Sequence, residues 1–158
     1  IDRALSGKNI QYHMFRGSLS GKGQDNAKAI YNQHEGDNVA STTLYADTFK
    51  NNRSQYYWRL AERFHNTWKA VTNGEYIDPD SMIALNSDGI EDLQALRSQL
   101  CRIPQKQNGQ GLIQIMSKDD MAKLDIKSPN EGDAVMMSTF APKVRKVVQQ
   151  VANRGWYG

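Results

Sequence analysis

The segment Gly109–Phe140, GQGLIQIMSKDDMAKLDIKSPNEGDAVMMSTF, determines how the rest of the chain is organised. Asn108 and Gly109 form a typical hairpin-turn pair, and the apolar run at 112–116 after them predicts a strand. Ser117 with Asp120 three residues later resembles a helix capping box, which predicts a short helix after the strand. The segment therefore begins as a strand and continues as a helix.

The second half of this segment contains a well-marked helix start. Ser128–Glu131 combines a capping hydroxyl, a proline at the first helical position and a carboxylate, so we expect a helix from Gly132 to about Pro142. Helical spacing places Asp133 on one face with three apolar residues, Met136, Met137 and Phe140. Burying a lone carboxylate costs on the order of several kcal/mol. Asp133 is therefore either a metal ligand or a residue paired with a Lys, an Arg or backbone N–H groups.

The composition indicates one soluble globular domain of 158 residues, with 39% apolar and 23% charged residues. The net charge of +3 and the pI near 9.0 are compatible with a polyanionic partner without identifying one. A single Cys101 and the lack of any apolar run near membrane length predict a reducing, cytoplasmic setting and no membrane partner. Residues 1–5 resemble the end of a helix, which favours a chain that is part of a longer protein.

The N-terminal third predicts a strand followed by a loop. Alternating residues at 10–14 indicate a half-buried strand, and a strand after a helix end suggests an α/β layer. Residues 17–48 are poor in large apolar side chains, so we expect a long mobile loop there. Its glycine-rich stretch at 17–23 lacks the spacing of a nucleotide-binding loop.

The longest expected helix covers about 51–72. One stripe of it is apolar and predicts a core face, made by Tyr57, Leu60, Ala61, Phe64, Trp68 and Val71. Lys50, Asn52 and Arg53 lie at its start, where cations and amides suit DNA phosphates; a solvated basic face is the alternative.

Shorter elements follow this helix. Helical segments are expected to open at Asp78 and Asp88, and a strand at 101–106 should pair with 112–116 in an antiparallel hairpin. Residues 143–158 form a basic amphipathic tail, which either packs back on the domain or docks on a partner or DNA backbone.

Three segments, Phe49–Phe64, Asn108–Met121 and Ser128–Met137, together resemble the nuclease domain of the large terminase subunit, the genome-packaging motor of tailed bacteriophages. This resemblance implies an RNase H-like α/β fold, a mixed sheet flanked by helices. It also implies a hydrolase site in which three acidic residues hold two divalent metals, Mg or Mn, and cut viral DNA. The similarity runs from Phe49 to Pro142.

The resemblance assigns roles to particular residues. Asp133 matches the last metal-binding Asp of the family, Asn130 occupies a supporting position one turn earlier, and Lys118 matches a lysine at the edge of the site that is a candidate phosphate contact. The other two family carboxylates fall in a region that this chain lacks. Residues 1–142 are therefore expected to be a partial nuclease domain, incomplete at its N-terminal side and inactive alone.

The resemblance also implies a setting. Expected partners are double-stranded DNA, the portal protein, the small terminase subunit and an ATPase domain of the same parent chain, at the procapsid portal in the host cytoplasm. Two alternatives remain open: a non-catalytic docking module for the portal or DNA backbone, and an RNase H-like resolvase or integrase relative.

Overall fold

A computed structural model describes residues 14–31 and 43–140 of the chain. The helix end expected at 1–6, most of the strand expected at 10–14 and the tail at 143–158 therefore lie outside the described residues. In the described ranges, no helix combines the length and the apolar character needed to cross a bilayer.

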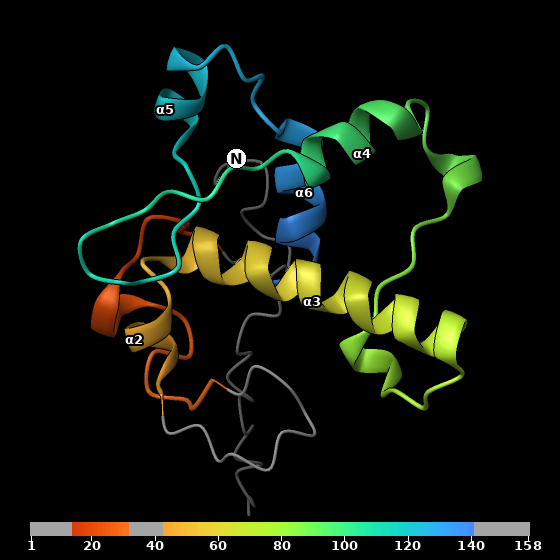
Figure 1. The fold of residues 1–158 in the computed structure, drawn as a ribbon, viewed down its shortest axis with the longest axis horizontal. Helices are drawn as coiled ribbons and strands as arrows, with labels where there is room; N and C mark the ends of the chain where they lie inside the picture. The colour runs from red at the N-terminus through yellow and green to blue at the C-terminus, as the bar shows by residue number, and fades with distance from the viewer. Residues whose placement is uncertain (1–13, 32–42, 141–158) are drawn as a thin grey trace, which may run out of the picture.

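The described part of the fold is organised around one long helix (Figure 1). Its helices in chain order are α2 (Tyr45–Thr48), α3 (Asn52–Asn73), α4 (Leu93–Cys101), α5 (Lys118–Lys123) and α6 (Asn130–Ser138), with short 3₁₀ turns η1 (Gly21–Gly23), η2 (Pro79–Ser81) and η3 (Ser87–Gly89). Helix α6 packs against both α3 and α4, so these three helices form the centre of the structure.

Helix α3 matches the predicted helix closely in its bounds. The Asn51 side chain accepts a hydrogen bond from the Ser54 amide at 2.9 Å and caps its start. Gly74, with φ of 70°, ends it in a left-handed conformation that glycine adopts without strain. The expected core stripe is wrong at its C-terminal end, because Trp68 is 54% exposed and Val71 80% exposed. Helical spacing identifies a face but not which neighbours cover it.

The described residues contain isolated β-bridges rather than extended strands. The expected hairpin exists as one antiparallel bridge, Gln105 with Ile115, and Phe49 pairs in parallel with Ile113. Cys101 does not begin a strand as predicted: it is the exposed last residue of α4. Asp92 caps α4 by accepting from the Ala95 amide, which starts a helix whose apolar positions continue through Leu100. The mixed sheet expected from the sequence is not formed within the described segments.

The region expected to be a long loop contains regular structure in its described parts. Turn η1 and helix α2 lie within 17–48, and Ile30 pairs with Leu44 across the segment. The buried Gln24 side chain donates to the Phe49 carbonyl at 2.7 Å. Polar and aromatic contacts hold the described parts of this region in place, so a search for large aliphatic side chains underestimates their order.

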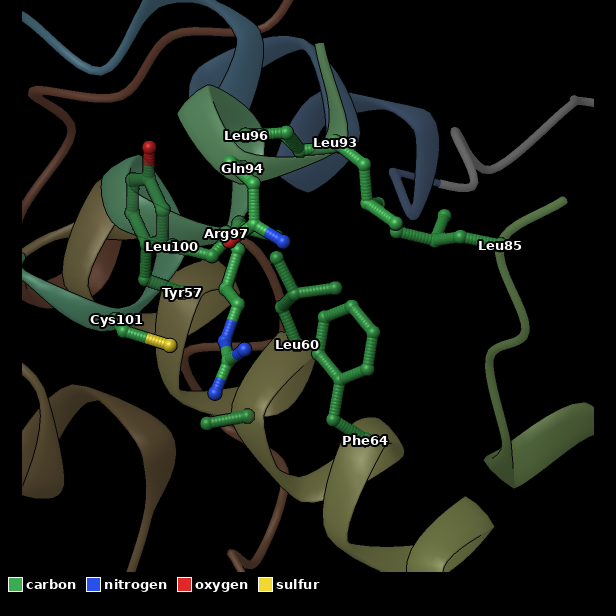
Figure 2. A pocket seen from close by; sticks show the side chains of 11 residues that line it. Tyr57, Leu60, Phe64, Leu85, Leu93, Gln94, Leu96, Arg97, Leu100 and Cys101 are labelled. Atoms are coloured by element: carbon green, nitrogen blue, oxygen red, sulfur yellow. The ribbon is translucent and has the colours of Figure 1, made fainter. Parts of the chain in front are cut away.

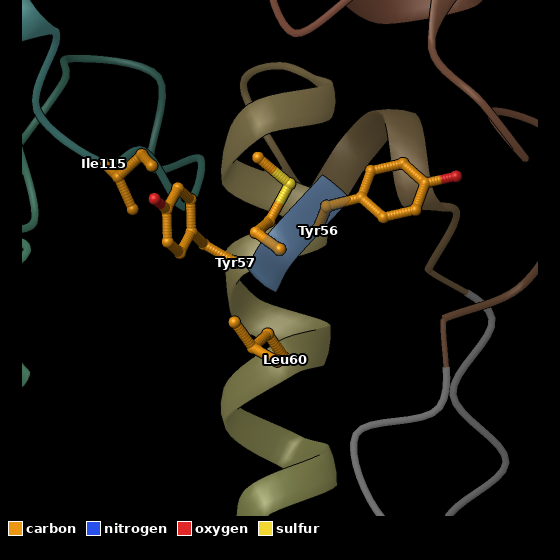
Figure 3. Close-up of a cluster of buried hydrophobic side chains, with 5 residues drawn as sticks. Tyr56, Tyr57, Leu60 and Ile115 are labelled. Atoms are coloured by element: carbon orange, nitrogen blue, oxygen red, sulfur yellow. The ribbon is translucent and has the colours of Figure 1, made fainter. Parts of the chain in front are cut away.

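The apolar core lies where α3, α6 and the 112–116 segment meet (Figure 3). Its buried members are Tyr56, Tyr57, Leu60, Ile115 and Met136. Beside this core, an apolar pocket of about 470 Å³ opens between α3 and α4, lined by Leu60, Phe64, Leu93 and their neighbours (Figure 2). Tyr57 contributes both to the core and to the pocket wall.

Candidate functional site

Helix α6 begins with a cap that comes from another helix. The Gln99 side-chain oxygen of α4 accepts from the amides of Glu131 (3.0 Å) and Gly132 (3.1 Å). Ser128, the predicted cap, instead donates to the Asn130 side chain at 2.9 Å, and no side chain of the N-cap residue Pro129 caps the helix. The helix also begins and ends earlier than the predicted 132–142. Its first turn is therefore positioned by α4, whose Leu100 packs close to Gly132.

Asp133 lies one turn into α6 and is 7% exposed. Of the apolar residues predicted to share its face, Met136 is 1% exposed and Phe140 packs partly buried against the core, whereas Met137 is 42% exposed, so the packing does not cover the whole face. The prediction of a carboxylate set against apolar neighbours holds for Asp133 and Met136.

The two oxygens of Asp133 have different partners. Oδ1 accepts from the Tyr57 hydroxyl at 2.6 Å and from Arg53 Nη2 and Nε at 3.3 and 3.4 Å. Oδ2 lies 2.6 Å from Lys118 Nζ, on a lysine whose side chain is 48% exposed. Oδ1 is thus held by α3, while Oδ2 faces the more open side of the site.

The charges around Asp133 keep it ionised. Burial by itself raises the pKa of the Asp133 carboxyl, but hydrogen bonds from Lys118 and Tyr57 and the charges of Arg53 and Lys118 outweigh it and lower that pKa. Burial, followed by the hydrogen bond to Asp133, raises the pKa of the Tyr57 hydroxyl, which therefore remains a donor.

The residues predicted to bind DNA at the start of α3 have separate environments. Arg53 turns inward and also donates to the Met116 carbonyl at 2.9 Å. Asn52 is 1% exposed, and its amide is used by Arg16 and Asp25, so the predicted DNA contact is not available to it in this structure. Lys50 Nζ donates to the exposed Gln110 side chain at 2.8 Å.

Lys118 indicates where a cation can sit in this site. Its ammonium lies 2.6 Å from Asp133 Oδ2 and 3.4 Å from Asn130 Oδ1, so two oxygens of α6 face the same positive charge. Carboxylate and amide oxygens are donors that suit hard divalent cations. The two residues fit part of the coordination of one such ion.

A complete two-metal site is not present in the described ranges. No group of three or more His, Cys, Asp or Glu residues that could hold a metal ion occurs there. The carboxylate of Asp133 is paired with two cations, Arg53 and Lys118. The local charge of these three residues is positive, which favours an anion such as a phosphate at the exposed side.

Sequence reasoning missed two residues of this site. Tyr57 was placed in the apolar stripe. Two signals could have found it: it lies four positions after Arg53, on the same face of the helix, and a buried tyrosine hydroxyl needs a hydrogen-bond partner. Gln99 carried no local signal, because it caps a helix that begins about 30 residues later in the chain.

The likeness to solved structures is substantial. The nuclease domain of the large terminase subunit gp2 of bacterial virus Sf6 is 36% identical, with a TM-score of 0.74, over 89% of this chain and 57% of that one. Lysine-to-alanine variants of that gp2 domain, determined with calcium and with manganese, match at the same identity and TM-score. This chain thus spans somewhat more than half the length of those relatives. No protein-family model matches the chain, and no curated protein sequence does.

Proposed function

We propose that this chain belongs to a metal-dependent DNA endonuclease that cuts concatemeric viral DNA during genome packaging. The basis of the proposal is the relationship of the chain to the nuclease domain of the large terminase subunit, which its sequence motifs predicted and the structural likeness confirms. The observation that carries the proposal is the arrangement at α6. There, the Asp133 carboxylate is buried against the core and presents Oδ2, together with Asn130 Oδ1, to a cation.

The residues at this site have distinct proposed roles. Asp133 Oδ2 and Asn130 Oδ1 would hold one divalent cation, Mg or Mn, of a two-metal set in which one ion would lower the pKa of an attacking water and the other would stabilise the leaving oxygen. Lys118, half exposed at the edge of the site, would contact the scissile phosphate. The carboxylates that complete a two-metal set and the mixed RNase H-like sheet would come from parts of the domain beyond the described residues. The described residues by themselves, which hold no group of three metal-binding side chains, are therefore expected to be inactive.

The wider setting is a proposal that extends the same relationship. We place the intact protein at the procapsid portal in the host cytoplasm, with double-stranded DNA, the portal protein, the small terminase subunit and its own ATPase domain as partners.

Replacing Asp133 in the full-length protein tests the catalytic proposal. In Asp133→Ala, we expect cleavage of plasmid DNA with Mn²⁺ to fall at least about a thousandfold, as for removal of a group needed in the transition state, while DNA translocation continues. Asp120→Ala is the matched control, because Asp120 is an acidic residue of α5 that pairs with Lys106 and Lys123 rather than with the site. Unchanged cleavage by Asp133→Ala would reject the nuclease assignment.

A second candidate is a docking module that binds DNA backbone or the portal without cutting. The excess of positive charge from Arg53 and Lys118 over Asp133 favours phosphate binding at this face. In this case Lys118→Ala would weaken DNA binding and flatten its salt dependence, whereas Asp133→Ala, which removes the local negative charge, would strengthen binding.

A further inference from the structure

Tyr57 and Arg53 both donate hydrogen bonds to the same oxygen of Asp133. The Tyr57 hydroxyl and two nitrogens of Arg53 all donate to Oδ1, and none of them is hydrogen-bonded to Oδ2. A carboxylate oxygen with three donors has little capacity left for another ligand. Oδ2, whose contact is the ammonium group of a half-exposed lysine, keeps that capacity.

The donors to Oδ1 are themselves fixed. Arg53 is anchored at its other end by the Met116 carbonyl, and its guanidinium lies 5.2 Å from the centre of the Tyr57 ring. Tyr57 is 7% exposed, and its ring is part of the apolar core. Both residues lie on α3, four positions apart, so a rigid helix presents them together.

We propose that Arg53 and Tyr57 act as positioning residues that fix Asp133 Oδ1 and leave Oδ2 as the oxygen that binds a divalent cation. This inference rests on the proposed nuclease function. Asp133 would then bind the cation through one oxygen, in a fixed orientation. Residues that hydrogen-bond to metal ligands commonly orient them in this way. The proposal assigns Arg53 a role at the site other than the DNA contact predicted from its sequence position.

Tyr57→Phe in the full-length protein is the decisive variant, because it removes one donor to Oδ1 and keeps the ring in the core. We expect Mn²⁺ affinity, measured by electron paramagnetic resonance titration, to fall about tenfold or more. The kcat for DNA cleavage should fall with it, while the KM for DNA stays unchanged.

Tyr56→Phe is the matched control. Tyr56 is the adjacent buried tyrosine of the same helix, at 3% exposure, and Asp25 rather than Asp133 is the carboxylate beside its hydroxyl. Tyr56→Phe should leave the Mn²⁺ affinity as in the unmodified protein.

Arg53→Lys tests charge and geometry separately. It keeps the positive charge but loses the guanidinium group that bonds to both Met116 and Asp133. We therefore expect Arg53→Lys to weaken Mn²⁺ binding and Arg53→Ala to weaken it more.

The outcomes distinguish this inference from the function on which it rests. If Asp133→Asn loses Mn²⁺ binding but Tyr57→Phe and Arg53→Lys keep it, the positioning role is wrong and the nuclease assignment stands. If Asp133→Asn also binds Mn²⁺ and cleaves DNA normally, the metal role of Asp133 fails and the positioning role fails with it.

Discussion

The two halves of α3 have similar apolar patterns and very different environments. In the first half, 52–60, buried residues include Asn52, Ser54 and Gln55 as well as Tyr56, Tyr57 and Leu60. In the second half, 61–73, no residue is buried, although Phe64, Trp68 and Val71 continue the stripe. The first half meets α6 and the 112–116 segment, and the second half extends beyond them (Figure 1). Burial in this helix thus depends on what packs against it more than on its own pattern.

This difference also explains where the site is. The buried half supplies Arg53 and Tyr57 to Asp133, and a buried polar network requires neighbours that satisfy its members. The exposed half packs through Phe64 against the edge of the core and the pocket beside α4, and Thr67 donates a hydrogen bond to the Ile83 carbonyl in a loop at 2.7 Å. The candidate site therefore lies beside the half of α3 whose packing restricts its side chains.

The two halves should differ most in how much stability is lost when an apolar side chain is shortened to alanine. Leu60, at 2% exposure, lies in the core cluster, so Leu60→Ala should lower the free energy of unfolding by about 3 kcal/mol through lost burial and a cavity. Val71→Ala, at a site 80% exposed, should change it by less than about 0.5 kcal/mol. Urea unfolding of both variants measures this, and equal losses would contradict the contrast.

Removing a satisfied buried amide should cost somewhat less. Asn52 accepts from the Asp25 amide and donates to the Arg16 carbonyl and the Asp25 carboxylate. Asn52→Ala leaves these groups without their partner, so we expect a loss of about 2 to 3 kcal/mol in urea unfolding. Asn73→Ala is the control in the exposed half, where the side chain donates to Glu75 and its removal should cost less than about 0.5 kcal/mol.

The parts of the fold that follow from local signals could be predicted. The bounds of α3 follow from Asn51 and Gly74, and the Ser117 cap marks the start of α5, because caps act within a few residues. The parallel bridge of Phe49 with Ile113 and the capping of α6 by Gln99 depend on neighbours distant in sequence. Local patterns carry no information about such contacts.

The candidate site divides in the same way. The apolar face of α6 indicates that Asp133 is unusual, and the placement of Lys118 and Asn130 beside it agrees with the order of the motifs. Asp133 pairs with Arg53, 80 positions away in the sequence, and with Tyr57, 76 positions away. A buried tyrosine hydroxyl signals that a partner exists, but one sequence does not identify which residue it is.

Alkaline pH should lower the free energy of unfolding in part through Tyr56, in the buried half of the helix. Burial, with the charge of Asp25 second, raises the pKa of Tyr56 to about 12 from the ordinary value of 10.0. As the pH rises, Tyr56 loses its hydroxyl proton at a lower pH in the unfolded chain than in the folded one. The stability that protonated Tyr56 contributes is therefore complete below about pH 10 and is lost as the pH rises towards 12. In urea unfolding at pH 12, Tyr56→Phe should recover about 2 kcal/mol of the alkaline loss. Parallel pH profiles for Tyr56→Phe and the unmodified protein would refute this.

The smallest expected effect is a gain in stability at Gln55. Gln55 is fully buried on the same helix as Asn52, yet neither its amide oxygen nor its amide nitrogen has a hydrogen-bond partner among the described residues. An unpaired buried amide destabilises the folded state, and methionine has nearly the same shape without the polar group. Gln55→Met should therefore raise the free energy of unfolding by about 1 kcal/mol, opposite in sign to Asn52→Ala. A loss instead would show that the Gln55 amide is satisfied in solution, and that burial in this half of α3 is matched by hydrogen bonds at Gln55 as it is at Asn52.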